Sequence, residues 1–323
     1  MKQILTSISL IALMGSQAAV AAEPATSYPS KPVRAIVGYA PGGGSDIMGR
    51  IMAQELTKSF GQQMIVENRA GAAQNVAAEM IARSPADGYT LFMSSAALGI
   101  NISLYPKLSY HPVKDFAPVA LFSISPNLLL THPSLPPKSV KEFIAFAKQY
   151  PGKLNYSSSG SGSTQHLSGE MLKVMTGIGI VHVPYRGTSQ AVPALLGGHV
   201  QVLWASYPNL KAGVEGGLIR LLANNGLGRS PLLPELPPVA DIIPGFDLVS
   251  VIGLYARADT PEPIVRKIGD EAIAVMKQAD IKPPLAGLGM EPVGEIGEQF
   301  AKIIANEIAT ITKVVEATGI KPK

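Results

Sequence analysis

Residues 33–67 read VRAIVGYAPGGGSDIMGRIMAQELTKSFGQQMIVE, and this stretch decides the fold class. Residues 33–38 are short and mostly apolar, which predicts a buried strand. Over residues 46–60 an apolar side chain recurs every four positions, which predicts an amphipathic helix ended by Gly61. The four recurring residues are Met48, Met52, Leu56 and Phe60. Residues 64–67 predict a second strand, so the order is strand, loop, helix, strand.

The same alternation continues along the chain. Residues 75–84 have the pattern of a second helix and residues 89–93 that of a third strand. An order of β-α-β-α-β implies parallel strands joined by right-handed crossovers, with ligands bound at the carboxyl ends of the strands. The loops after Gly38 and Met93 are therefore candidate parts of a binding site.

A second cycle of strands and helices begins near Asn127. Its expected strands are residues 128–131, 154–157, 180–183 and 200–204, and its expected helices are residues 139–150, 164–176 and 190–196. Ser139 and Glu142 stand three apart as a capping box, which supports a helix start at Ser139. A Pro-rich stretch, residues 231–244, interrupts the regular pattern. A strand at residues 248–255 and helices at residues 261–278 and 298–318 follow.

The length of the chain, 323 residues, indicates two domains. Without residues 1–22 roughly 300 residues remain, which is more than one hydrophobic core usually serves, so we expect two domains of about 150 residues each. The sequence contains no cysteine, so stability must come from a core rather than from disulfides. A cleft between the two domains is a natural binding site.

The N-terminus has the pattern of a secretory signal peptide. Lys2 is followed by a largely apolar run over residues 4–14 and by small residues as far as Ala22. We therefore expect residues 1–22 to be removed on export. The run is too short for a stable transmembrane helix, and no later segment has the roughly 18 uninterrupted apolar residues that a span requires. Because no cysteine follows the cleavage region, we expect no lipid anchor.

The charge balance argues against a nucleic-acid partner. The formal net charge of +4 falls by one, to +3, when the expected signal peptide removes Lys2, the only charged residue of residues 1–22. This excess is too small for a nucleic-acid footprint, and the sequence contains no run rich in Lys and Arg. An anionic small solute would not be repelled.

The loop that joins the first strand to the first helix has the chemistry of an anion site. Residues 39–46, YAPGGGSD, contain three glycines that let the backbone approach a ligand, and the helix start offers unpaired N–H groups and a partial positive charge. A carboxylate fits this chemistry. A P-loop would need Gly-Lys-Ser/Thr at its end, and the dinucleotide pattern G-x-G-x-x-G is absent. The alternative is a tight turn without a ligand, and Asp46 is expected to complement the helix dipole rather than to contact an anion.

A second candidate loop, residues 157–166, also joins a strand to a helix. Its sequence is SSSGSGSTQH, and its hydroxyl and N–H groups would face the first loop across the cleft. A nucleophilic serine is an alternative, but no serine lies in G-x-S-x-G and the five histidines lack metal-binding spacing. A flexible linker is a second alternative, although the loop lies between well-patterned elements. His166 is a ligand contact or a structural hydrogen-bonding residue of its helix.

Several residues at strand ends are further candidates. Ser94 and Ser95 end the third strand, where their hydroxyls would reach the cleft or form a polar strand end. Trp204, the only tryptophan, precedes Ser206 and either walls the ligand pocket or packs in the core. The same alternatives apply to Tyr185.

The chain resembles the Bug family, the periplasmic receptors of tripartite tricarboxylate transporters. The resemblance rests on motifs in order along nearly the whole mature chain: residues 28–32 (YPSKP), 40–46 (APGGGSD), 66–69 (VENR), 87–91 (DGYTL), 105–108 (YPKL), 115–118 (DFAP), 162–167 (GSTQHL), 182–185 (HVPY) and 195–198 (LLGG). It implies an α/β, two-domain periplasmic-binding-protein fold of type II, a Venus flytrap, with a parallel-dominated sheet in each domain. It also implies, together with the composition shift, that the first domain comprises residues 28–124 and 245–323 and the second residues 125–244.

The resemblance further implies how a ligand is held. Family members grip a carboxylate with the two loops, partly through ordered waters, and pass it to two membrane subunits. The matching positions are Tyr39, Gly42 and Gly43 in the first loop and Ser159, Ser163 and Thr164 in the second. Gly38 stands where the family usually has Pro, which puts the rigidity of the first loop in doubt.

Together these observations predict a periplasmic receptor that binds a small organic carboxylate and is not an enzyme. The alternative is a serine-dependent hydrolase acting on a small acid in the same cleft. We expect a monomer without cofactor or metal that serves integral membrane subunits, with a dicarboxylate, a tricarboxylate, an aromatic acid or an uncharged mimic as ligand. The predicted ligand-binding residues are Tyr39, Ala40, Gly42, Gly43, Ser94, Ser95, Ser159, Ser163, Thr164, His166, Tyr185, Trp204 and Ser206.

Overall fold

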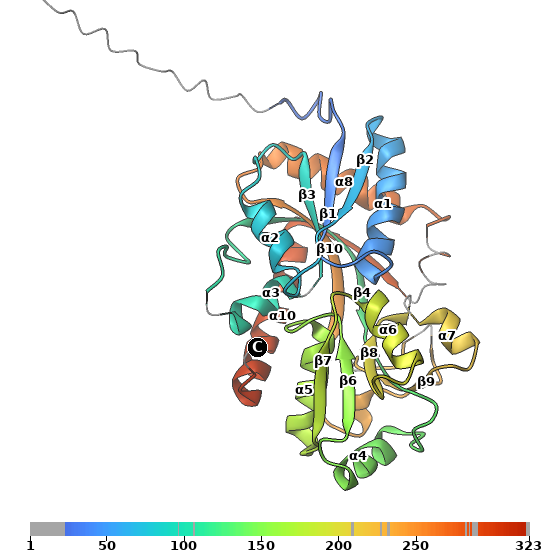
Figure 1. The fold of residues 1–323 in the computed structure, drawn as a ribbon. Helices are drawn as coiled ribbons and strands as arrows, with labels where there is room; N and C mark the ends of the chain where they lie inside the picture. The colour runs from blue at the N-terminus through green and yellow to red at the C-terminus, as the bar shows by residue number, and fades with distance from the viewer. Residues whose placement is uncertain are drawn as a thin grey trace, which may run out of the picture.

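A computed structural model gives the fold of most of the chain (Figure 1). It describes residues 23–95, 97–105, 107–207, 210–226, 228–230, 233–281, 283, 285 and 290–320. The predicted signal peptide, residues 1–22, lies outside the described residues. No helix within the described ranges is long and apolar enough to cross a membrane.

The first sheet has six strands in the order β11-β4-β10-β3-β1-β2. Its strands are β1 (Val33–Val37), β2 (Met64–Asn68), β3 (Thr90–Ser95), β4 (Phe116–Pro126), β10 (Val249–Arg257) and β11 (Glu291–Ile296). Strand β1 pairs in parallel with β2 and β3, as the β-α-β-α-β pattern predicts. Strand β10 runs antiparallel to both β3 and β4, and β11 runs antiparallel to β4.

The second sheet has five strands in the order β7-β6-β8-β5-β9. Its strands are β5 (Leu128–Thr131), β6 (Leu154–Ser158), β7 (Ile180–Pro184), β8 (Val202–Ala205) and β9 (Arg220–Asn224). Strand β6 pairs in parallel with β7 and β8, whereas β5 runs antiparallel to β8 and β9. Both sheets are therefore mixed rather than parallel-dominated, because β10 and β5 run against their neighbours.

Helices cover both faces of each sheet, so each sheet has a core on either side. Against the first sheet pack α1 (Gly44–Phe60) and α8 (Glu262–Lys277) on one face, and α2 (Asn75–Ala82), α3 (Ala97–Leu104) and α10 (Gly297–Thr318) on the other. Against the second sheet pack α4 (Val140–Gln149) and α5 (Thr164–Thr176) on one face, and α6 (Thr188–Leu196) and α7 (Lys211–Glu215) on the other. We call the two sheets with their helices the first and the second lobe.

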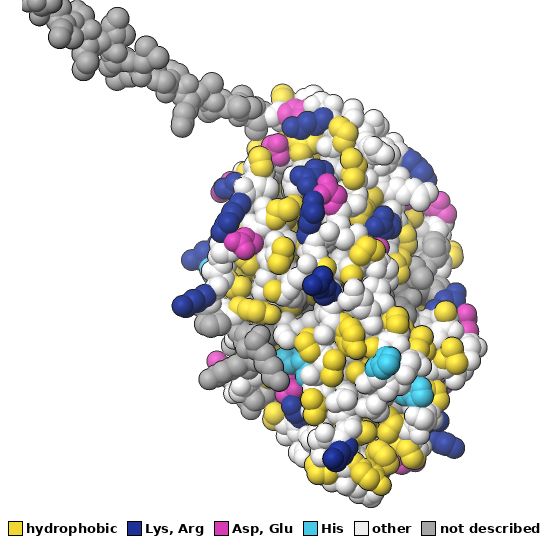
Figure 2. Space-filling view, viewed as in Figure 1, with side chains coloured by type: hydrophobic (Ala, Val, Ile, Leu, Met, Phe, Trp, Pro, Cys, Tyr) yellow, Lys and Arg dark blue, Asp and Glu magenta, His cyan; other side chains and the backbone are white. Residues whose placement is uncertain are grey.

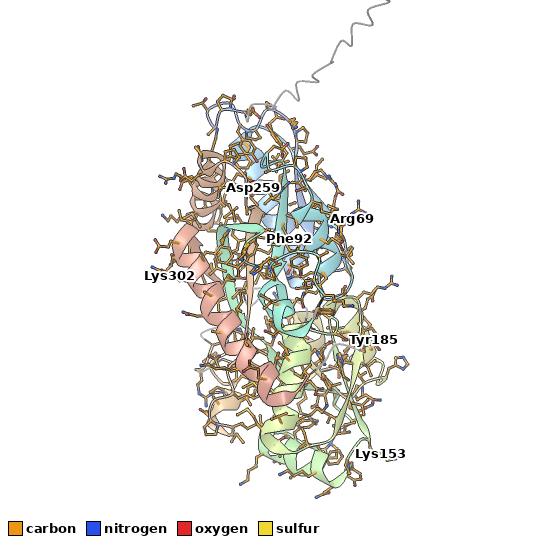
Figure 3. All side chains as sticks on the ribbon, turned by 90° about the vertical axis from the view of Figure 1, so that its left-hand side faces the viewer. Arg69, Phe92, Lys153, Tyr185, Asp259 and Lys302 are labelled. Atoms are coloured by element: carbon orange, nitrogen blue, oxygen red, sulfur yellow. The ribbon has the colours of Figure 1, made fainter. Side chains whose placement is uncertain are left out.

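The chain passes between the lobes at two places. Asn127 separates β4 of the first sheet from β5 of the second, and residues 225–248 lead from β9 back to β10. Helix α10 lies alongside α5 and packs against it, so the C-terminal part of the chain also contacts the second lobe (Figures 1 and 3). The domain boundaries expected from the sequence remain a prediction.

The predicted caps are present with one change. Gly61 ends α1 in the left-handed conformation, with its N–H donating to Thr57 O. The Ser139 hydroxyl accepts from Glu142 N as expected, but the Glu142 carboxylate accepts from Lys138 N rather than from Ser139 N. The capping box is thus shifted by one residue on the carboxylate side.

The surface agrees with the modest net charge. On the face in Figure 2, basic side chains are scattered among acidic, apolar and neutral ones and do not gather into one patch.

Candidate functional site

Two neighbouring cavities lie between the lobes. The inner cavity has a volume of about 40 Å³ and is lined by Tyr39, Gly43, Gly44, Ser45, Ser95, Asn127, Ser159, Thr164, Gln165, Thr188, Ser206 and Ile252. The outer cavity, of about 430 Å³, is lined by Tyr39, Gly71, Ala72, Ala73, Gln74, Tyr105, Ser159, Gly160, Ser161, Pro184, Tyr185, Arg186 and Gln190. Tyr39 and Ser159 line both, so these two residues mark the border between the cavities.

Three helices begin at the inner cavity. They contribute Gly44 and Ser45 from α1, Thr164 and Gln165 from α5, and Thr188 from α6. The N-cap residues of α1 and α6, Gly43 and Gly187, provide no capping side chain. First-turn N–H groups and the positive ends of helix dipoles favour an anion, so this convergence makes the inner cavity suited to a carboxylate.

The inner cavity is polar without being charged. None of its lining residues is a Lys, Arg, His, Asp or Glu. Burial raises the pKa of Tyr39 to about 12, although its hydrogen bond with Ser95 Oγ opposes this effect. Tyr39 is therefore neutral at physiological pH, and an anion in the cavity would meet neutral donors.

Asp46 holds the first loop in place. Its carboxylate accepts hydrogen bonds from Gly42 N (2.8 Å), from Asn68 Nδ2 (2.9 Å) and from Arg50, whose guanidinium is 3.0 Å away. Burial alone would raise the pKa of Asp46, but the bonds from Arg50, Gly42 and Asn68 together outweigh burial and lower it. The carboxylate is thus occupied by the protein, and the loop it braces includes Tyr39, whose carbonyl accepts from Asn68 Nδ2.

Gly38 allows the first loop to pack closely. A Cβ at this position would overlap the Cβ of Gln74. The Gln74 side chain is fully buried and bonds both backbone groups of Ser95, accepting from its N (3.3 Å) and donating to its O (3.1 Å). Gly38, at the position where the resemblance led us to expect Pro, therefore does not loosen the packing of the first loop. Ser95 lines the inner cavity, whereas Ser94 is fully buried and donates to Ser95 O.

A hydrogen-bond chain orders the second loop and α6. Gln165 accepts from Ser159 N (2.6 Å) and donates to Thr188 Oγ1 (2.8 Å). Asn127 Nδ2 donates to Thr164 Oγ1 (3.1 Å). Each threonine hydroxyl is an acceptor in these bonds, so its own proton is available to donate into the cavity.

Ser163 and His166 support the loop from behind and do not line either cavity. Ser163 is the N-cap of α5, and its hydroxyl accepts from His166 N. His166 Nδ1 accepts from Gly162 N (3.1 Å), and its ring stacks on His182 at 4.0 Å between centroids. Burial lowers the pKa of His166 to about 4, so the ring is neutral at physiological pH and keeps its acceptor. For His166 the structure favours the structural alternative.

Ser158 and His182 form a pair that superficially resembles part of a hydrolase site. Ser158 Oγ lies 2.6 Å from His182 Nε2. Ser158 is fully buried, however, and its hydroxyl also bonds Gly160 N and O. A nucleophile must be reachable by its substrate, so this geometry describes a structural pair.

The prediction that Trp204 contacts a ligand is wrong. Its side chain is fully buried, packs in the core on the α4 and α5 face and meets the Tyr156 ring edge-on at 5.6 Å. Side chains alternate along a strand, so Leu203 faces α6 and Trp204 faces away from it. Ser206, beyond the end of β8, does line the inner cavity, and Tyr185 lines the outer one.

The lobes contact each other beside the cavities. Tyr105 Oη in the first lobe donates to Ser161 O in the second (2.9 Å). A Cβ at Gly187 would lie 3.1 Å from the Cβ of Ala40, and one at Gly42 would lie 3.6 Å from that of Ser189. Ala40 and Gly42 therefore face the other lobe rather than a cavity, and the cleft is closed around the inner cavity.

The sequence reasoning missed several lining residues. At the inner cavity they are Gly44, Ser45, Asn127, Gln165, Thr188 and Ile252, and at the outer cavity they are Gly71, Ala72, Ala73, Gln74, Tyr105, Gly160, Ser161, Pro184, Arg186 and Gln190. Gly44, Ser45 and Gln165 lie at helix starts within the two loops already singled out. Their position in the sequence could therefore have identified them. Thr188 was missed because α6 was expected to begin two residues later.

Comparisons with known proteins agree over most of the chain. A sequence profile described as "Tripartite tricarboxylate transporter family receptor" matches residues 48–320. The protein BugT of Bordetella pertussis is 34% identical over 316 residues, covering 97% of this chain and 96% of BugT. The structure of R. palustris Rpa4515 with adipate is 34% identical with a TM-score of 0.88, covering 92% of this chain and 100% of Rpa4515. MatC from Rhodopseudomonas palustris with bound malate is 32% identical with a TM-score of 0.84, covering 89% of this chain and 100% of MatC.

Proposed function

This chain belongs to the tripartite tricarboxylate transporter receptor family, and on that premise we propose that it captures a small organic carboxylate in the inner cavity for a membrane transporter. The proteins that it matches are substrate-binding receptors rather than enzymes. The hydrolase alternative receives no support from them.

The convergence of three helix N-termini on one uncharged cavity is the observation that supports this proposal most strongly. A cavity needs roughly 10–15 Å³ to hold one water, and about 40 Å³ leaves space for a single small polar group such as a carboxylate. The helix starts supply N–H donors and a favourable potential without a cation. Rpa4515 with adipate and MatC with malate are relatives with carboxylate ligands.

We assign direct contacts to residues whose side chains or N–H groups border the inner cavity. They are Tyr39, Gly43, Gly44, Ser45, Ser95, Asn127, Ser159, Thr164, Thr188 and Ser206. Asp46, Gln74, Ser163 and His166 act by holding these residues in position.

The location and partners complete the proposal. Receptors of this family are periplasmic binding proteins, and the signal peptide expected at residues 1–22 would direct this chain to the periplasm. We propose that a monomer releases its ligand to integral membrane subunits of the transporter. Cell fractionation of an epitope-tagged full chain tests the location. We expect the tagged protein in the periplasmic fraction, and we expect deletion of residues 2–14 to abolish its export.

Calorimetry with a panel of carboxylates tests the binding function. The tightest acid should raise the melting temperature without being converted to a product. Thr188→Val removes a hydroxyl donor at the inner cavity while keeping the side-chain shape, and it should weaken binding by about 1.5–3 kcal/mol, or roughly tenfold to 150-fold. Thr131→Val is the matched control, because Thr131 is also buried, has no hydrogen-bond partner for its hydroxyl among the described residues and lies in β5 outside both cavities.

Two results would contradict the proposal. Steady product formation from a bound acid would indicate an enzyme. Equal affinities for Thr188→Val and Thr131→Val would place the ligand away from the inner cavity.

A further inference from the structure

Among the described residues that line the outer cavity Arg186 alone is charged, and we propose that its guanidinium receives a second anionic group of the ligand. Arg186 thereby becomes the residue that selects α,ω-dicarboxylates over monocarboxylates. This inference rests on the proposed function, because it assumes that the first carboxylate occupies the inner cavity.

Ligand size makes the outer cavity part of the binding site. The inner cavity, at about 40 Å³, has space for one end of a ligand, while the outer cavity offers about 430 Å³. Tyr39 and Ser159 border both cavities, so the remainder of a longer ligand would extend past these residues toward the outer one.

The walls of the outer cavity suit an aliphatic chain. Ala72, Ala73 and Pro184 present small apolar side chains, and the rings of Tyr105 and Tyr185 add to them. Ala72 and Ala73 have φ angles of 45° and 48°, a left-handed conformation that is unfavourable for alanine and persists only where the surroundings enforce it. This wall is therefore a fixed surface against which methylene groups can pack.

The backbone of Arg186 is held at the start of α6 by a hydrogen bond within its own segment. Its N–H donates to Gln190 Oε1 (3.3 Å), and it directly precedes Gly187, the N-cap of α6. The same segment thus provides Thr188 to the inner cavity and Arg186 to the outer one. A dianion that spans the two cavities would lie along this segment.

The charge of Arg186 has no acidic partner among the residues that the structure describes. Among the described residues no acidic group within 4.0 Å pairs with Arg186, and none of the residues that line either cavity is Asp or Glu. An incoming carboxylate would supply the missing charge. Arg186 is exposed, so solvent screens this pair and its contribution should lie at the lower end of the range for hydrogen bonds to charged groups.

Calorimetry on the mature protein tests the assignment. The probes are unbranched dicarboxylates of four to eight carbons and the monomethyl ester of each, which keeps the length but removes one charge. We expect at least one dicarboxylate to bind about tenfold tighter than its ester. Arg186→Gln should remove that difference by weakening the dicarboxylate about tenfold while leaving the ester unchanged. Lys153→Gln makes the same charge change at the far end of the second lobe and should alter neither affinity (Figure 3).

The outcomes separate this inference from the proposed function. If monocarboxylates bind as tightly as the dicarboxylates, or if Arg186→Gln weakens acid and ester equally, Arg186 is not the selecting residue although the receptor function stands. If Lys153→Gln has the same effect as Arg186→Gln, the effect is one of overall charge, and the inference is overturned. If no carboxylate of any kind binds, the proposed function itself has failed.

Discussion

Replacing Gly187 by alanine tests whether ligand binding requires the closed cleft. Gly187 has a φ of 172°, an extended conformation that alanine adopts without strain. The added Cβ would lie 3.1 Å from the Ala40 Cβ and 3.2 Å from the Ala40 N, both closer than the 3.4 Å at which ordinary contacts begin. Since Gly187 belongs to the second lobe and Ala40 to the first, the overlap exists only while the lobes are closed.

The magnitude follows from the cost of overpacking. An extra methyl forced into a well-packed contact costs about 1–3 kcal/mol. The lobes can relieve this overlap by opening a few tenths of an ångström, so the cost falls on the closed, ligand-bound state and not on folding. The apparent Kd should therefore rise about 5-fold to 150-fold, in proportion to the loss of the closed population.

The assay combines calorimetry with thermal melting of the ligand-free protein. Gly187→Ala should weaken the tightest carboxylate while its ligand-free melting temperature stays that of the wild type. Gly228→Ala is the control, because its Cβ would meet no atom within 4 Å and it lies outside both cavities. Unchanged affinity in Gly187→Ala would refute the link between closure and binding, and a large drop in ligand-free melting would show that the contact supports folding instead.

Two further predictions concern stability. Trp204→Ala should lower the free energy of unfolding by about 3–5 kcal/mol, since it empties a fully buried core position; denaturant titration showing a loss below about 1 kcal/mol would contradict the core assignment. Burial lowers the pKa of His166 from its ordinary value of 6.5 to about 4, so the unfolded chain binds a proton more readily than the folded protein does. Stability is therefore fully present above about pH 6.5 and should fall by roughly 3 kcal/mol as the pH drops to about 4, with no further loss from this group below that. Denaturant titrations between pH 4 and pH 7 measure this slope, and an equally steep slope in His166→Asn would show that other groups cause it.

Periodic segments were predictable from the sequence, and segments without a one-sided pattern were not. Helix α5 was expected at residues 164–176 and is found there, because its apolar residues recur with the helical period and Ser163 caps it. Helix α3 was missed since it combines apolar and polar residues without a consistent face. Strand β11 was missed because it contains Pro292 and Gly294, which disfavour a regular strand.

The site was predictable where it depends on local backbone and not where it depends on the packing of separate elements. Gly-rich and Ser-rich loops before helices identify Gly43 and Thr164 from the sequence alone. The face of a strand is different: both faces of the second sheet are covered by helices, so alternation cannot tell which side Trp204 occupies. Asn127 was out of reach because only the folded chain brings it beside the first loop.

The central claim is that a carboxylate lies among the N-termini of α1, α5 and α6, and amide chemical shifts test it most directly. Spectra of isotope-labelled protein with and without a saturating carboxylate would report on each N–H group. We predict large downfield shifts of the amide protons of Gly44 and Ser45 in α1 and of Thr188 in α6, with little change at Lys153 in the distant part of the second lobe. Saturation that leaves the helix-start amides unshifted while other amides respond would contradict the account.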